Sequence, residues 1–594
     1  MLILGNLLFA AGFFGLAREL FFWEKSSRKL QGLLWLSISV WSVCCIHVLI
    51  AAVLQAFTVF IGTLSIGAFD LAAAVLLHFA RRGNRQQYLW HKLDIGICGL
   101  LFILTVVVGF LRYGIHLEMT YRSVDGITHY YEAFHVFESG RIKAMYFAAL
   151  NNSFLVSFFA PFVKVTRLYH VEPIADMGWF YLSGITVFGF IREKCKTRFS
   201  LYAASFLGFF YLMGYPLNNL LMGFLYLGIG VTIAGVIFIL TDFYMEEESM
   251  KLPSTIFLML GCLGLITSYA FFVPPVFLAV FLALCIKRRS DFSQWVKKII
   301  GGGICIFLIP CIVGIAYTWC GIFTDGVTLS SAIGLEGDIY RNNYSDYLPV
   351  LALAIVGFLA GCRKGKLLCV RIVFVLEFMY ILILLFLSAN EYVSAYYFYK
   401  NNYLFWLILH LLAIYAVANV YARQTKIYIT AACVVWLIPL AFSLLSVEEK
   451  LKEENEYLSP ELHGGGSYCA VFRDNCLELR KVRGHNLTLY VSAPDKVELY
   501  EAGYELHKTE HAAVFPVSDM ADRFFLNVVT NQWDLSYLNI SIDEYMPRLK
   551  KDNPKYISVL KESDCYKKHR EYLEQFPKIY ENPSGFIAIY GGWN

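Results

Sequence analysis

Charged residues are scarce in this chain. Only 16% of its 594 residues are Asp, Glu, Lys or Arg, whereas 58% are hydrophobic, and the mean hydropathy is +0.55. Soluble globular chains carry about 25% charged residues, so the composition excludes an ordinary soluble protein and predicts a membrane protein. No run of Lys and Arg is long enough to form a nucleic-acid surface, and we expect no nucleic-acid partner.

Sequence motifs for metals and nucleotides are also missing. Most cysteines lie inside apolar stretches, where cysteine acts as a small hydrophobic residue. The three cysteines of the C-terminal part, Cys469, Cys476 and Cys565, form neither a CxxC pair nor a Cys/His zinc spacing. The three glycines at 301–303 are not followed by Lys-Ser or Lys-Thr, so they are not a P-loop.

Long apolar runs make up most of the chain. A transmembrane helix needs about twenty apolar residues, and about fourteen stretches meet or approach that length. They lie at residues 2–22, 32–55, 58–80, 95–113, 178–191, 200–214, 217–241, 255–271, 274–286, 299–319, 348–361, 367–387, 404–420 and 428–446. The sequence therefore predicts a polytopic α-helical membrane protein, with N-terminal membrane helices over 1–94 and a membrane core over 95–446.

Basic residues predict how these spans are oriented. Clusters of Lys and Arg fall in alternate loops, for example at 24–29, 81–92 and 287–298, and such loops favour the cytoplasmic side. We therefore expect the N-terminus, the long loop 114–177 and everything after the last span to lie outside the cytoplasm. The expected location is a plasma membrane, crossed many times.

The C-terminal part has a different composition. The sequence predicts a charged stalk followed by a glycine hinge at 447–466, and a soluble extracytoplasmic domain at 467–594. Alternating apolar residues predict strands at 468–472, 477–482, 487–491, 497–500, 512–517, 524–529 and 585–590, with helices near 542–549 and 566–576. We expect a β-rich α+β domain.

The long loop 114–177 concentrates ionisable side chains. Asp125 and His129 are four residues apart and share one face of a helix. Glycosyl transfer needs a base that takes the proton of the acceptor, often with a carboxylate near a metal ion, and Asp125 is suited to both roles. The alternative is that a long external loop carries an acid by chance.

The same loop carries a resemblance to a known family. Residues 123–131 (SVDGITHYY), then 138–141 (ESGR), Pro161 and Pro173 resemble the GT-C superfamily of membrane glycosyltransferases, which use polyprenyl-phosphate-linked sugars. The resemblance covers roughly residues 95–446. It implies that Asp125 is the catalytic acid, supported by His129, or a ligand of Mg²⁺ or Mn²⁺ if the enzyme uses a metal. Many members have a second acid where this chain has Val124 and Gly126.

Two later external loops, 324–347 and 390–402, supply further candidates. A lipid-linked phosphate needs cations at the membrane rim, and the candidates are Arg341, Lys400 and Arg122. We expect the acceptor or the sugar to contact Tyr130, Glu132, Glu336, Asp338 and Tyr396. An aromatic belt at the membrane interface is the structural alternative for Tyr396.

The resemblance, together with these candidate residues, implies transfer of a sugar from a polyprenyl-phosphate carrier to a cell-envelope polysaccharide or glycolipid on the outer face. One alternative is a flippase of lipid-linked glycans or another transporter, in which Asp70 and Glu377 inside spans would serve an ion pathway. Pairing with a neighbouring helix is the structural explanation for both residues. The third hypothesis is a non-catalytic membrane scaffold that binds envelope glycan.

Overall fold

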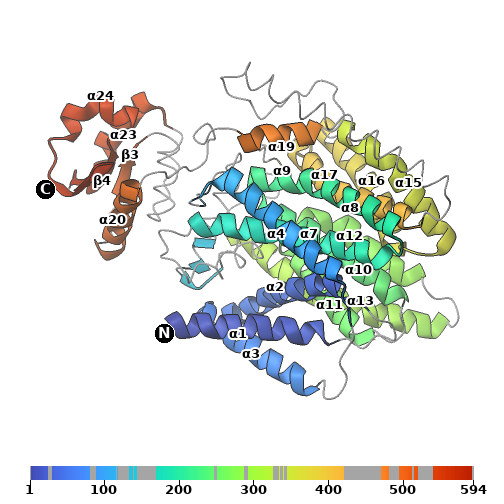
Figure 1. Cartoon of the computed structure of the whole chain (residues 1–594). Coiled ribbons are helices and arrows are strands. Elements are labelled where there is room, and N and C mark those ends of the chain that lie inside the picture. Colours follow the sequence, from blue (N-terminus) through green and yellow to red (C-terminus); the bar gives the residue numbers. More distant parts are fainter. Residues whose placement is uncertain are drawn as a thin grey trace.

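The computed structural model describes residues 2–23, 30–80, 88–115, 117, 119, 133–134, 136–137, 139–142, 169–246, 251–286, 292–324, 334, 339, 344–419, 470–480, 494–510, 514–518 and 540–591. The helices of the membrane bundle are α1 (Leu2–Phe21), α2 (Gly32–Ala56), α3 (Thr63–Ala80), α4 (Lys92–Tyr113), α7 (Val171–Lys194), α8 (Arg198–Met213), α9 (Tyr215–Met222), α10 (Leu225–Glu246), α11 (Lys251–Ile266), η3 (Ala270–Phe272), α12 (Val273–Ile286), α13 (Phe292–Thr324), α15 (Tyr344–Lys364), α16 (Leu368–Ala389) and α17 (Ala395–Ala418). Figure 1 shows them as one bundle, with a smaller C-terminal domain beside it.

The prediction of a polytopic helical membrane protein is confirmed. Nine helices of the described residues are long and apolar enough to cross a membrane. A helix satisfies all its backbone hydrogen bonds internally, which is what the lipid environment requires. The number of about fourteen spans stays a prediction, because the last expected span, 428–446, lies outside the described residues.

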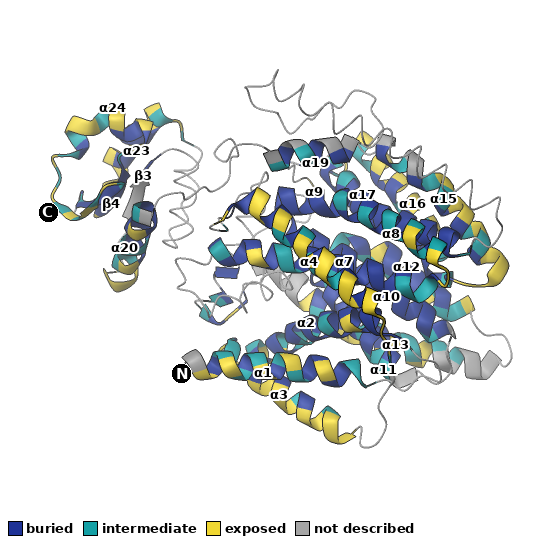
Figure 2. Ribbon diagram, viewed as in Figure 1, coloured by how far each residue is buried: buried dark blue, intermediate teal, exposed yellow. Residues whose placement is uncertain are grey.

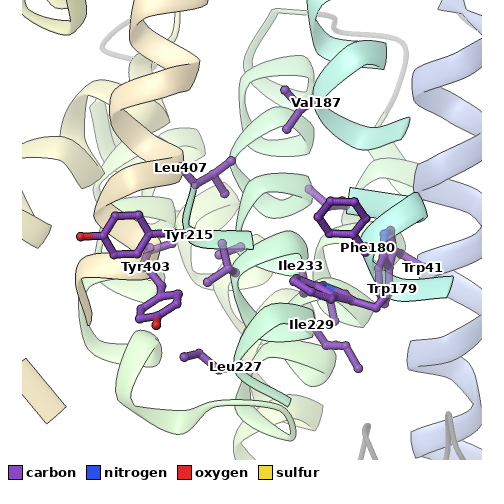
Figure 3. Packing of buried hydrophobic residues seen from close by; sticks show 14 of the residues in the cluster. Trp41, Trp179, Phe180, Val187, Tyr215, Leu227, Ile229, Ile233, Tyr403 and Leu407 are labelled. Atoms are coloured by element: carbon purple, nitrogen blue, oxygen red, sulfur yellow. The ribbon is translucent and has the colours of Figure 1, made fainter. Parts of the chain in front are cut away.

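Two helices form the centre of the bundle. The apolar windows of α10 and α17 are entirely buried, whereas α3 and α16 bury only 22% of theirs. Exposed residues follow the outer helices α3 and α4 (Figure 2). Large side chains of five helices interlock at this centre (Figure 3): Trp41 of α2, Trp179 and Phe180 of α7, Tyr215 of α9, Ile233 of α10, and Tyr403 and Leu407 of α17. This packing fixes the frame on which the two ends of the bundle are built.

The bundle has two chemically distinct ends. At the first, which we call the Asp94 end, Asp94 of α4 accepts hydrogen bonds from Gln31 and from Arg192 at the C-terminus of α7. The short parallel strands β1 (Leu30–Gln31) and β2 (Tyr88–Leu89) lie there. At the other, the Asn475 end, Arg112 at the C-terminus of α4 meets α9 and a helix from beyond the last predicted span, α19 (Ala470–Arg480).

Two sequence predictions about the membrane part are corrected. The stretch 217–241 is not one span, because Gly223 takes a left-handed conformation (φ 79°) and ends α9 before α10 begins. The segment 390–402 is a loop only as far as Ser394, which caps α17. The polar run after Ser394 is helical, and within α17 Asn401 and Asn402 satisfy their side-chain amides by donating to carbonyls one turn earlier, at 2.8 and 3.0 Å.

The C-terminal domain is α+β, with more helix than predicted. It contains α20 (Pro494–Glu510), α23 (Ile542–Asp552) and α24 (Asp564–Leu573) around a sheet of β3 (Val514–Val517), β4 (Tyr556–Leu560), β5 (Lys578–Asn582) and β6 (Gly585–Ile589). The strand order is β3-β4-β6-β5, parallel between β3 and β4 and antiparallel elsewhere.

The strands predicted at 512–517 and 585–590 and the helices at 542–549 and 566–576 are confirmed. Those predicted at 468–472, 477–482 and 497–500 are wrong where described, since α19 and α20 occupy them. Short apolar runs do not distinguish a strand from the buried face of a helix. The strands predicted at 487–491 and 524–529 lie outside the described residues.

Candidate functional site

The last turn of α4 carries two polar side chains into the Asn475 end. Arg112 donates to the backbone carbonyl of Leu221 at 3.0 Å, and its guanidinium lies 4.0 Å from the carboxylate of Glu478 on α19. The next residue, Tyr113, donates its hydroxyl to Asp176 of α7 at 2.9 Å. All these polar side chains are buried. Burial without water strengthens each of these electrostatic contacts.

Asn475 ties α19 to the break between α8 and α9. Its amide donates to the carbonyls of Met213 and Gly214, both at 2.8 Å, at the junction between α8 and α9. Its side-chain oxygen accepts from Asn218 of α9 at 3.1 Å, and Asn218 in turn accepts from Tyr403 of α17 at 2.5 Å. A connected chain of polar groups therefore joins α8, α9, α17 and α19.

Buried carboxylates reach this end from three helices. Glu172 and Asp176 are four residues apart on the first turns of α7, and Asp474 and Glu478 are four apart on α19. In a helix this spacing puts both members of a pair on one face. Asp346 of α15 accepts from the backbone N–H of Val471 at 3.3 Å, and so fixes the start of α19. Acids of this kind in a membrane bundle are candidates for function, because their burial is costly.

Lys400 occupies an aromatic box at the N-terminal part of α17. Its ammonium lies 3.9 Å from the ring centre of Tyr396, 4.5 Å from that of Phe224 and 4.8 Å from that of Tyr226. The same ammonium donates to the Tyr226 hydroxyl, and only 2% of the residue is exposed. Aromatic faces stabilise a cation that has left water, so the box holds a buried positive charge.

Only two predicted site residues, Lys400 and Tyr396, lie in the described part of the chain, and the structure brings them together. The expectation that Lys400 lies in a loop is wrong, because α17 starts at Ala395 and the side chain is enclosed by neighbouring rings. The predicted residues Asp125, His129, Tyr130, Glu132, Arg122, Glu336, Asp338 and Arg341 lie outside the described residues.

Sequence reasoning missed most of the residues that converge here. The sequence places Arg112 in the predicted span 95–113, Glu478 in a predicted strand of the soluble domain at 477–482, and Asn475 between two predicted strands. The available signal was the pair of i,i+4 acids on α19, which a helical reading would have placed on one buried face.

Asp70 and Glu377, the two ionisable residues considered for an ion pathway, have different surroundings. Asp70 of α3 meets His47 of α2 at 2.7 Å, both buried, which confirms that Asp70 pairs with a neighbouring helix. Glu377 of α16 is fully buried, and neither carboxyl oxygen has a hydrogen-bond partner among the described residues.

A divalent cation needs several ligand side chains placed close together. Within the described ranges, no group of three or more His, Cys, Asp and Glu side chains is placed to hold a metal ion. Asp125, the expected ligand, lies outside these ranges, so metal binding stays a prediction.

Comparison with solved structures gives a distant structural similarity. No protein-family model matches the chain, and no curated protein matches it. Among solved structures, the chain is similar to the one titled "Crystal Structure of ArnT from Cupriavidus metallidurans in the apo state". The TM-score is 0.41 at 12% sequence identity, and the match covers 84% of this chain and 98% of that chain. A similarity of this degree carries no conclusion about activity, ligands or residue roles.

Proposed function

We propose that the chain is a GT-C-like membrane glycosyltransferase that moves a sugar from a polyprenyl-phosphate carrier to an acceptor of the cell envelope on the outer face. The observation that carries the proposal is the Asn475 end, where Arg112, Asp176, Glu478 and Lys400 are buried at one end of the bundle. The loop that contains Asp125 joins α4 to α7 at this same end.

The proposed reaction needs a base that takes a proton and a cation that stabilises the phosphate, both in defined places. Asp125, supported by His129, takes the proton of the acceptor hydroxyl as its oxygen bonds to the anomeric carbon. The bond from that carbon to the carrier phosphate breaks, and polyprenyl phosphate leaves with both bonding electrons. Arg122, Arg341 and Lys400 stabilise the negative charge of that phosphate.

The described residues support this arrangement in two ways. Tyr113 donates to Asp176 and leaves the acid in a defined orientation beside the end of α4. The aromatic box holds the Lys400 ammonium in one place, beside the rings of Tyr396, Phe224 and Tyr226. A fixed charge that does not have to reorganise is worth more in the transition state than a mobile one.

The test is transfer of label from a radiolabelled polyprenyl-phosphate sugar in membranes, at matched protein levels. We expect wild type to label an acceptor and Asp125→Asn to lose at least about 100-fold in rate. Asp176→Asn tests the described part of the end in the same assay. Equal transfer by wild type and Asp125→Asn would remove Asp125 from the mechanism.

A transporter is the second candidate, and Glu377 is the observation that favours it. A carboxyl group buried in a span without a partner among the described residues is the kind of group found on ion pathways. In the enzyme, Glu377→Gln and Asp70→Asn should leave transfer intact. Absence of transfer with every donor sugar, together with loss of function in Glu377→Gln, would favour the transporter.

A further inference from the structure

A contact links the C-terminal domain to the long loop. The ring of Tyr504 on α20 packs edge-on against Phe134 in that loop, with ring centres 6.1 Å apart and planes at 88°. Phe134 is fully buried and Tyr504 is 2% exposed. Edge-to-face packing of this kind is a specific arrangement of two aromatic rings.

The loop residues around Phe134 are also fastened to the membrane bundle. The carbonyl of Gly140 accepts from the N–H of Ile61 at 2.9 Å. Ile142 exchanges two hydrogen bonds with the side chain of Gln55, at 3.0 and 2.7 Å. Val136 packs into the apolar cluster between α1, α2 and α3. The segment is therefore held from both sides, by the bundle and by α20.

On the other side of this contact, α20 is a fixed part of its own domain. Asn582 of β5 donates to the carbonyl of Asp495 at 2.5 Å, and Lys496 forms an ion pair with Glu562. Leu499 packs against the sheet at Gly585. A displacement of the domain is therefore transmitted to Phe134 through Tyr504.

We infer that Tyr504 is a positioning residue, through which the C-terminal domain holds the loop segment that follows Asp125 and His129 in the chain. This inference rests on the proposed function for its catalytic consequence, but the contact itself does not depend on it. The domain then affects the rate of transfer through the position of the loop.

The ring of Tyr504 and not its hydroxyl makes the contact. The hydroxyl is buried and has no hydrogen-bond partner among the described residues. A Tyr504→Phe variant therefore keeps the interaction and serves as the conservative rescue, whereas Tyr504→Ala removes it. Tyr572→Ala is the matched control, because Tyr572 packs against Phe576 and Tyr590 within the same domain.

Trypsin cleavage of the full-length protein in membranes tests the contact without any assay of activity. The loop offers cleavage after Arg141, which is exposed, and after Lys143. We expect Tyr504→Ala to be cut there about threefold faster or more than wild type, because the loop opens more often. Tyr504→Phe and Tyr572→Ala should be cut at the wild-type rate.

Phe134→Ala repeats the test from the loop side and leaves the domain unchanged, which covers the case that Tyr504→Ala unfolds it. Equal cleavage of wild type and Phe134→Ala would overturn the inference. Cleavage of Tyr504→Phe as fast as that of Tyr504→Ala would overturn it as well.

A double-mutant cycle then tests the catalytic consequence. We expect Tyr504→Ala and Phe134→Ala each to lower kcat by about tenfold with little change in the KM for the donor, because misplacement of the loop disturbs the reacting geometry. The double variant should be no slower than either single one, since both remove the same contact. Multiplied effects would overturn the inference. If wild type transfers no sugar, the proposed function fails, and the trypsin result alone decides whether Tyr504 holds the loop.

Discussion

The membrane bundle and the C-terminal domain contain ion pairs that differ in burial. In the bundle, Asp94 and Arg192 are 98 residues apart in the chain and meet at 2.6 Å between α4 and α7, with the Asp94 side chain fully buried. In the C-terminal domain, Asp564 pairs with Lys567 three residues later on one exposed helical turn. The first pair joins two distant segments inside the fold, whereas the second is local and exposed to water.

The difference follows from the cost of desolvation. A charge inside the bundle must find a partner that only the complete fold supplies, and removing one member leaves the other unsatisfied. An exposed pair gains about 0–1 kcal/mol, because water and salt screen it. The Asp94–Arg192 pair therefore depends on the complete fold, whereas the exposed Asp564–Lys567 pair contributes little to it.

Loss of Arg112 should give the largest effect. Arg112→Met leaves the buried carboxylate of Glu478 and the Leu221 carbonyl without this partner, and we expect a loss of about 3–5 kcal/mol in the free energy of unfolding. Thermal unfolding in detergent measures it. Adding Glu478→Leu removes the stranded charge and should recover part of the loss. A double variant as unstable as the sum of both single ones would contradict a shared buried pair.

Asp94→Ala should come next, at about 2–4 kcal/mol. It removes the contact with Arg192, the hydrogen bond from Gln31 and the cap on the first turn of α4 through the His91 N–H. Since the Asp94 end is far from the proposed reaction, transfer per folded molecule should stay at the wild-type level. Asp564→Ala is the surface control and should change stability by less than about 0.5 kcal/mol. Similar losses for both acids would remove the distinction between the two regions.

The positions of the helices are visible in the sequence, whereas the pairing of buried polar residues is not. Apolar runs determine where most helices lie, and the run 32–55 matches α2 within a residue or so. The sequence pattern does not show which polar residues meet, because Arg112 lies near the start of the membrane core and Glu478 lies beyond its end. Their pairing depends on how α4 and α19 pack, which is a tertiary property.

Polar character misled the prediction where the fold supplies local partners. The run after Ser394 looked like a loop because it contains Lys400 and two asparagines. Inside α17, however, each asparagine bonds a backbone carbonyl and the lysine is surrounded by rings. Likewise Asp70 inside a span indicated either a pathway or a pair, and only the structure shows His47 beside it.

Lys400 and Lys550 permit a direct comparison of one interaction in both regions. Lys400 is buried over several rings, whereas Lys550 is exposed and lies 4.2 Å from the ring centre of Tyr572. Lys400→Met keeps the shape of the side chain, so we expect folding to be retained and kcat/KM for the donor to fall about tenfold, equal to about 1.4 kcal/mol. Lys550→Met should leave kcat/KM unchanged. An unchanged kcat/KM in Lys400→Met would make Lys400 a structural cation.

The smallest expected effect is the pH dependence of the C-terminal domain. Hydrogen bonds from Lys578 and Tyr566 hold the pKa of Glu574 below its ordinary value. A carboxylate with a lowered pKa in the folded state stabilises it fully above the unfolded pKa of about 4.3. That contribution is lost as the pH falls through the lower, folded pKa.

Hydrogen exchange of peptides from α24 and β5, corrected for the intrinsic effect of pH, measures this dependence in the full-length protein. Glu574→Gln should remove the acid-side loss of protection and cost less than about 1 kcal/mol at neutral pH, because the pair is partly exposed. An acid-side loss of protection that persists in Glu574→Gln would show that Glu574 does not carry this pH dependence.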